Sequence, residues 1–270
     1  MSTAASWTRS QVRAAADVGH LLRFRTTTRG RRRFAAGLAV FVAITVAVAV
    51  APAYLPGAGG GGYAFSVLLL VPSAMAGFLL LAVVAAVASG GGRELVARDQ
   101  LVAYPVSPTT DHLGALLLAP LNIGWLIQSW ALLGSAAFAV GRDDVGPLAV
   151  ALLAWIAAST AIGQLVAWTV EWVRRLPGGL VAVRVVAVLG LLGAALLQLT
   201  HRLAPALDHV PTRRLLALYL DGAWTWRWLL GVVVTLAAFA VATCLGAAPA
   251  TLAAHRPARE ETAAESSHVR

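Results

Sequence analysis

Six long apolar stretches, separated by short polar or glycine-rich segments, dominate the hydrophobic pattern of the chain. They cover residues 34–54, 65–89, 113–140, 147–173, 180–199 and 228–254. A helix needs about 20 mostly apolar residues to cross a bilayer, because the hydrocarbon core is about 30 Å thick and each residue adds about 1.5 Å. The pattern therefore predicts an all-α, polytopic membrane protein with six transmembrane helices.

The composition agrees with a membrane environment. The chain is 59% hydrophobic and 12% charged, and its mean hydropathy is +0.76, whereas soluble domains carry about 25% charged residues. A soluble core cannot bury this much apolar surface, but lipid can surround it. We divide the chain into a basic leader at 1–33, a six-span domain at 34–254 and a C-terminal tail at 255–270, which we expect to be disordered.

The placement of arginine predicts how the spans are oriented. Eight arginines and a single acid, Asp17, precede the first span, and Arg174 and Arg175 follow the fourth. Cytoplasmic loops of membrane proteins carry an excess of basic residues, so both termini are expected in the cytoplasm. The net charge of +9 is then a topology signal, and nucleic acid is not expected as a partner.

The leader has a helical pattern of its own. Ala14, Val18, Leu21 and Leu22 share one face of a helix, and arginines lie on another. We expect an amphipathic helix in the membrane interface; a disordered basic tail is the alternative. The first span also resembles a signal peptide, but its basic leader and apolar run are long, which favours an uncleaved anchor.

A compact polar segment interrupts the apolar pattern between the second and third stretches. Residues 93–104 suit a short helix, with an acidic and a basic side chain as i, i+4 partners. Pro105 ends this helix, because proline lacks an N–H and disfavours helical geometry in the preceding residue. Thr110 or Asp111 is then expected to cap the helix of the third span.

This layout resembles the membrane subunits of type-2 ABC exporters. Pro105-Val106-Ser107 matches a "PVS"-like turn of that family, and the run "YPVSPTTDHLGALLLAPLN" is similar to permeases of actinobacteria. The resemblance implies a coupling helix within 93–108 and short extracellular helices between the fifth and sixth spans. It also implies a bacterial cell membrane, a separate ATP-binding subunit, and a second copy of this permease or a related one.

Under this resemblance the coupling helix binds the ATP-binding subunit. The residues that would contact that subunit are Glu94, Arg98, Asp99 and Tyr104; the alternative is that their side chains only solvate a loop. The chain has no G-x-x-x-x-G-K-[ST] phosphate loop. ATP and magnesium are therefore expected on the partner, and no catalytic residue, metal site or cofactor is expected in this chain.

Three amide side chains interrupt the apolar spans, Asn122 and Gln128 in the third and Gln164 in the fourth. Polar residues inside a membrane line substrate paths or hydrogen-bond to neighbouring helices, and the sequence leaves both roles open. Glu171 precedes two arginines near the end of its span, so a local salt bridge is expected. Because the spans lack a charged cluster, an amphipathic or lipid-like substrate is favoured over a small ion.

Two features concern the last two spans. The connection between them contains "LLALYL", which is too short to cross the membrane, and Trp224, Trp226 and Trp228, which are typical of an interfacial aromatic belt. Gly190 and Ala194 lie four residues apart in the fifth span. Small residues at this spacing predict the close approach of a neighbouring helix.

Two other classes of protein stay open. A secondary transporter would usually need acids or broken helices near mid-membrane; here the spans hold no acid near their centres, and the two halves of the chain show no clear internal symmetry. A membrane enzyme or assembly component would need a cluster of reactive side chains inside the membrane. His112, His201 and His209 are isolated, and Cys244 has no second cysteine to pair with, so neither a metal site nor a disulfide is predicted.

Overall fold

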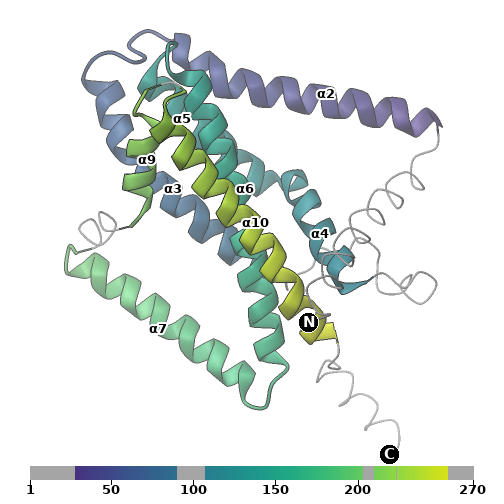
Figure 1. Ribbon diagram of the computed structural model, residues 1–270. Helices are drawn as coiled ribbons and strands as arrows, with labels where there is room; N and C mark the ends of the chain where they lie inside the picture. Colours follow the sequence, from purple (N-terminus) through teal and green to yellow (C-terminus); the bar gives the residue numbers. More distant parts are fainter. Residues whose placement is uncertain (1–27, 90–106, 203–209, 223, 255–270) are drawn as a thin grey trace, which may run out of the picture.

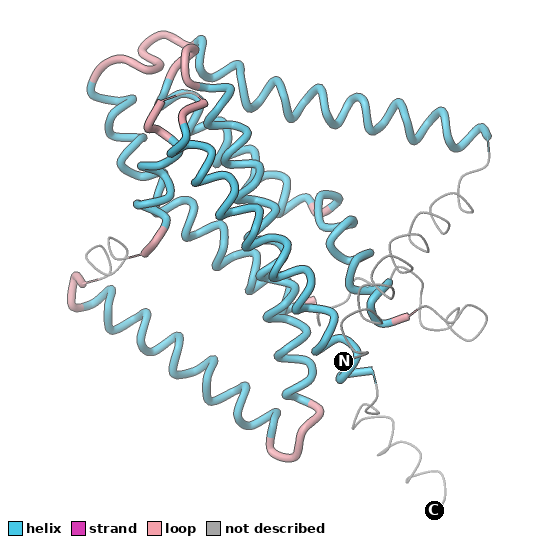
Figure 2. The backbone as a smooth tube through the Cα atoms, viewed as in Figure 1, coloured by secondary structure: helices cyan, strands magenta, loops and turns pink. Residues whose placement is uncertain are grey.

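Every regular element in the described part of the chain is a helix. The computed structural model describes residues 28–89, 107–202, 210–222 and 224–254, and Figures 1 and 2 show no strand among them. In chain order the elements are α2 (Thr28–Val50), η1 (Ala51–Tyr54), α3 (Gly62–Ala88), α4 (Pro108–Leu118), η3 (Ala119–Leu121), α5 (Ile123–Val140), α6 (Val145–Arg174), α7 (Gly179–Leu199), α9 (Thr212–Tyr219) and α10 (Trp226–Ala254).

Six helices are long and apolar enough to cross a membrane, which confirms the predicted number of spans. They are Ala35–Tyr54, Gly62–Ala88, Ile123–Val140, Val145–Arg174, Gly179–Leu199 and Trp226–Ala254. Together they support a multi-pass membrane protein, since a helix satisfies its own backbone hydrogen bonds in lipid. The amphipathic pattern at 14–22 and the tail at 255–270 lie outside the described residues.

The core forms around α6. Within its most apolar window 61% of residues are buried, compared with 33% or less in the other spans. α3, α5 and α10 pack around it (Figure 1). Leu148, Leu152 and Ile156 recur every four residues, so they line one face of α6, and all three are fully buried. Trp155 of α6 also donates its indole N–H to the backbone oxygen of Met75 in α3, at 3.1 Å.

A glycine allows α3 and α6 to approach closely. A Cβ atom added at Gly163 would lie 2.8 Å from the backbone oxygen of Ala82, which is closer than real Cβ atoms come to such a group. Small residues at helix interfaces allow this approach in membranes, where van der Waals packing drives helix association. Gly163 therefore sets the distance between the two helices.

α2 and α7 lie at the edge of the bundle. Figure 1 shows both standing away from the packed helices, and only 6% and 0% of their apolar windows are buried. Gly190 of α7 has open space where its side chain would be, and Ala194 is exposed. The close helix approach predicted for these two residues is therefore absent among the residues that the structure describes. Lipid is the solvent that suits their apolar surroundings.

The third span is broken, although the sequence analysis predicted one continuous helix over residues 113–140. α4 ends at Leu118, η3 forms a single turn, and α5 starts at Ile123. Pro120 lacks the N–H that would continue the helical ladder. Asn122 then begins the new helix, because its side-chain oxygen accepts a hydrogen bond from the backbone N–H of Gly124 at 2.9 Å.

The start of α4 also differs from the prediction. Ser107 is the N-cap, and its Oγ accepts a hydrogen bond from the backbone N–H of Thr110 at 3.1 Å. Pro108 occupies the first helical position, where a missing N–H costs nothing. Thr110 and Asp111 therefore lie inside the first turn, and neither is the cap.

The short helix α9 covers one end of the bundle. It packs against α10 and α3, and Tyr219 hydrogen-bonds through its hydroxyl to Oγ1 of Thr235 in α10. Burial raises the pKa of the Tyr219 phenol, so the hydroxyl stays protonated. One short helix, α9, therefore lies between the fifth and sixth spans among the described residues, at the end of the bundle where α10 begins (Figure 1). The extracellular placement of this connection stays a prediction.

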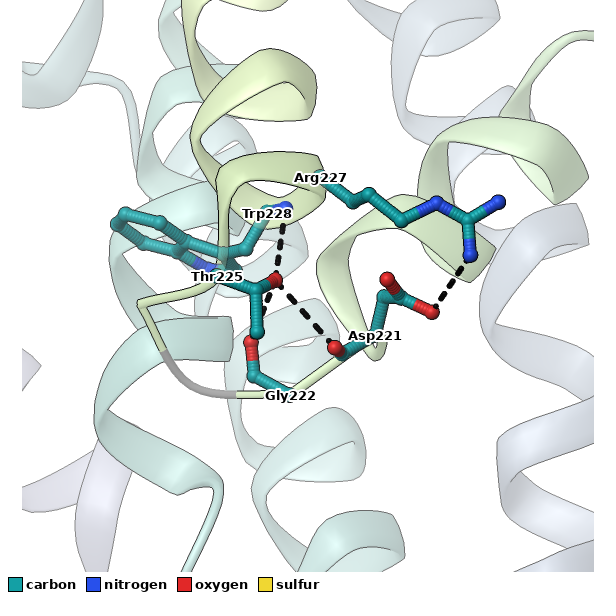
Figure 3. Close-up of polar contacts among 5 residues, drawn as sticks. All are labelled: Asp221, Gly222, Thr225, Arg227 and Trp228. Atoms are coloured by element: carbon teal, nitrogen blue, oxygen red, sulfur yellow. Dashed lines mark hydrogen bonds and ion pairs between the residues drawn. The ribbon is translucent and has the colours of Figure 1, made fainter.

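The connection from α9 to α10 is fixed by polar contacts, which Figure 3 shows. Arg227 pairs with Asp221 at 3.0 Å. Oγ1 of Thr225 accepts a hydrogen bond from the backbone N–H of Trp228 at 3.2 Å. These contacts hold the first turn of α10 against the end of α9.

The three tryptophans of this connection do not form one belt. Trp224 and Trp226 are 69% and 72% exposed, as an interfacial belt requires. Trp228 is buried, and its indole N–H donates to the backbone oxygen of Pro147 at 3.1 Å. Its placement in the aromatic belt was therefore wrong, because α6 lies against this face of α10.

Replacing Gly163 with valine should separate α3 from α6. We expect the free energy of unfolding to fall by about 1–3 kcal/mol, because the added side chain meets backbone that cannot rotate away. Unfolding in detergent micelles, followed by circular dichroism, measures this loss. Gly190→Val is the matched control and should change stability by less than about 0.5 kcal/mol. Equal losses in the two variants would contradict the proposed role of Gly163.

Replacing Trp228 with phenylalanine should leave the backbone oxygen of Pro147 without its donor. We expect a loss of about 1–2 kcal/mol, since an unsatisfied buried acceptor costs roughly that much. The same unfolding measurement applied to Trp226→Phe, at an exposed position, should show no significant change. A Trp228→Phe variant as stable as the natural chain would mean that this hydrogen bond is dispensable.

Candidate functional site at the break in the third span

Two hollows lie on either side of the break between α4 and α5. One is small and mixes amide and hydroxyl side chains with apolar ones; it lies between the break, α3 and α6 and is called the polar pocket below. The other is larger and apolar, and it lies between α4, α6 and α10. Because the break turns the chain between them, residues of the same short segment line both hollows.

The polar pocket has a volume of about 90 Å³ and brings together the three amides that the sequence analysis singled out. Asn122, Gln128 and Gln164 all line it. Its remaining polar lining comes from Ser89, at the end of α3, and from Thr160. Three residues spread over two spans therefore share one site, which the sequence spacing alone could not show.

The amides differ in how their hydrogen-bonding capacity is used. Gln164 is 7% exposed, and its Oε1 atom has no hydrogen-bond partner in the part of the chain that the structure describes. The side-chain oxygen of Asn122 is engaged in capping α5. Gln128 is half-buried. A buried carbonyl oxygen without a partner is costly, so Gln164 is the side chain in this pocket that most needs a donor.

The apolar pocket has a volume of about 450 Å³. It is lined by Leu113, Leu116, Leu117, Ala119, Pro120, Trp125, Leu153, Ile156, Ala157, Thr160, Phe239 and Thr243. Leu117 and Leu153 are 57% and 46% exposed, so the pocket has an apolar mouth on the side of the bundle. Its size lies within the range of about 300–1,000 Å³ that is typical of small-molecule sites.

Trp125 forms the partition between the two pockets. Ala119, Trp125 and Thr160 line both of them. The indole N–H of Trp125 donates to Oγ1 of Thr160 at 2.8 Å, and that hydroxyl donates to the backbone oxygen of Ile156 at 2.7 Å. The ring of Phe78 meets the indole edge-on, with 6.4 Å between centroids. The partition is thus held by α5, α6 and α3 together.

His112 fixes α4 against α10. Its side chain is fully buried, and its Nε2 atom lies 3.1 Å from the backbone oxygen of Thr243. A Cβ atom added at Gly246 would lie 2.5 Å from the His112 ring. The sequence analysis treated this histidine as isolated, because nothing in the local sequence links it to a partner 131 residues away.

An ion pair secures the far end of α6. Arg175 and Glu171 meet at 2.9 Å, which confirms the predicted local salt bridge. Arg175 also donates to the backbone oxygen of Ala253 in α10. Glu171 thus helps to position the arginine that ties α6 to α10. No group of residues that could hold a metal ion occurs within the described ranges.

The residues predicted to contact an ATP-binding subunit are Glu94, Arg98, Asp99 and Tyr104. They lie outside the described residues, in the connection between α3 and α4. Ser89 and Ser107 flank this connection, and α3 and α4 both contribute to the wall of the polar pocket.

Comparison with known proteins found no matching family model, no matching curated protein and no matching solved structure.

The contact between His112 and Gly246 can be tested with a double-mutant cycle. Gly246→Ala should cost about 1–3 kcal/mol of unfolding free energy, because the histidine ring must move. In a His112→Ala background the same substitution should cost much less, since the opposing ring is gone. Unfolding of all four proteins in detergent micelles gives the coupling energy. A coupling energy near zero would show that the two residues do not press on each other.

Proposed function

We propose that this chain is the membrane subunit of an ATP-driven ABC exporter of the type-2 class. A separate ATP-binding subunit docks on the cytoplasmic segment 93–108 and supplies ATP and magnesium. The chain itself carries no catalytic residue. A second copy, or a related permease, completes the transporter, and both termini face the cytoplasm of a bacterial cell.

One observation carries this proposal beyond the sequence pattern. The segment 93–108 connects α3 to the first turn of α4, and both of these helices line the polar pocket. A push on the connection would act on two walls of that pocket at once. A ligand shifts a protein from one state to another only if it binds the two states with different affinity. A binding site whose walls move between the two states would meet this condition, as a pump requires.

The break in the third span favours a secondary transporter as the second candidate. Broken helices near a binding site are a recurrent feature of that class. However, the acid Glu171 is tied to Arg175 at the end of α6 rather than near the break. Without an acid at the pocket, the described residues offer no carboxylate there to carry a proton.

The decisive experiment is co-purification of the tagged chain, expressed together with the ATP-binding proteins of its source. We expect an ATP-binding subunit to be recovered with it. Reversing the charge at Arg98 with Arg98→Glu should lower this recovery about tenfold, as loss of an interfacial charge contact does. Arg202→Glu is the matched control. Arg202 is exposed and lies just after the C-terminal end of α7, so its substitution should leave recovery unchanged.

Two outcomes would contradict the exporter. One is the absence of any ATP-binding protein in material that is folded and monodisperse. The other is transport into vesicles that collapses with the proton gradient but continues without ATP, which would support the secondary transporter.

A further inference from the structure

The two pockets at the break differ in their lining and share three residues of it, Ala119, Trp125 and Thr160. The larger is lined by Leu, Ile, Ala, Pro and Phe side chains with two threonines and the Trp125 indole, and the smaller contains amides and hydroxyls. The two pockets meet at the indole of Trp125, which donates a hydrogen bond to Thr160 and packs edge-on against Phe78. An apolar space beside a polar one is the pattern that an amphipathic molecule requires.

We infer that the two pockets form one binding site for a single-chain amphiphile with a small, uncharged head group. Its hydrocarbon chain lies in the apolar pocket, and its head group, a hydroxyl or a primary amide, reaches the polar pocket. This inference rests on the proposed function only in taking the bound molecule to be the exported cargo. The binding itself stands on the geometry of the break.

Gln164 determines the chemistry of the head group. Its Oε1 atom is buried and has no hydrogen-bond partner among the described residues, so a ligand that reached it with a hydrogen-bond donor would satisfy it. A hydroxyl or an amide N–H supplies such a donor, whereas an ester or a bare hydrocarbon does not. The pocket thus favours ligands that carry a hydrogen-bond donor, because leaving the Oε1 atom of Gln164 without a hydrogen bond costs free energy.

The described lining of the polar pocket does not favour a charged head group. Among the described residues its polar lining consists of Ser89, Asn122, Gln128, Thr160 and Gln164, as well as the Trp125 indole, and none of these is charged. Moving an unpaired charge from water into such a place is strongly unfavourable. The volume of about 90 Å³ is also small, since a water molecule occupies about 30 Å³ in the liquid. A phosphate-bearing lipid head group therefore does not suit this pocket.

The apolar pocket accounts for the chain of the ligand. It is about 450 Å³ in volume, and its mouth lies between the exposed side chains of Leu117 and Leu153. The hydrocarbon of the ligand would thus enter from the side of the bundle, where lipid surrounds the protein. Ala157 lies in the wall of this pocket, so a larger side chain there would fill the space.

The test uses the full-length chain in phospholipid nanodiscs and a photoreactive analogue of dodecanol. The analogue should label the peptides of α4, α6 and α10, and unlabelled dodecanol should compete. Gln164→Leu should weaken binding of the alcohol roughly five- to tenfold, as expected for one lost hydrogen bond to a buried group. The same variant should leave binding of the matched photoreactive alkane unchanged.

Two further variants distinguish binding in the pockets from nonspecific labelling of the protein surface that faces the membrane. Ala157→Phe should abolish labelling by both probes, because it fills the apolar pocket. Leu192→Phe, at an exposed position of α7, should change neither. If Gln164→Leu fails to fold, Gln164→Met replaces it, because methionine keeps the side-chain length and lacks the amide. Competition by unlabelled dodecanol on the natural chain gives an independent result.

Three results would overturn the inference. The first is equal competition by dodecanol, dodecanoate and the phospholipid of the disc, which would identify a groove for bilayer chains. The second is a Gln164→Leu variant that binds the alcohol as tightly as the natural chain does, and the third is labelling confined to α2 or α7. No ATP-binding subunit is present in this assay. Failure here, with co-purification intact, would therefore remove the ligand site and leave the exporter proposal standing.

Discussion

The structure depends on satisfying backbone and side-chain polar groups where lipid offers no hydrogen bonds. Regular helices meet this requirement for their own backbone. Side chains that cross between helices meet it by bonding to backbone oxygens, as Trp155 does with Met75 and Trp228 with Pro147. Each such contact joins two helices at a fixed position along their axes. The bundle around α6 is therefore set by a few polar contacts as well as by close packing.

Close packing supplies the second constraint. Without a hydrophobic driving force between helices in lipid, association depends on how near the backbones can come. Gly163 permits this between α6 and α3, and Gly246 permits it between α10 and the histidine of α4. Both glycines lie where a side chain would collide with its neighbour, so the core tolerates few changes there. α7 has no such contact over most of its length.

The break in the third span is where these two constraints produce a site. Because η3 turns the chain, α4 leans on α10 while α5 leans on α3, and unlike pockets remain on the two sides of Trp125. The polar pocket lies beside the helices that continue into the segment proposed to bind an ATPase. The proposed ligand site and the proposed docking segment would thus lie on the same short stretch of chain.

The sequence by itself determined the helical class, the number of spans and the local ion pair of Glu171, because each depends on apolar run length or on spacing within one helix. It also selected Asn122, Gln128 and Gln164 as unusual, since amides stand out in an apolar run. Only the tertiary structure decided that these three meet, that His112 lies on Gly246, and that Trp228 is buried. The break at Pro120 was within reach of the sequence, yet membrane helices often tolerate proline. Contacts between distant segments depend on how helices pack, and the local pattern carries no record of that packing.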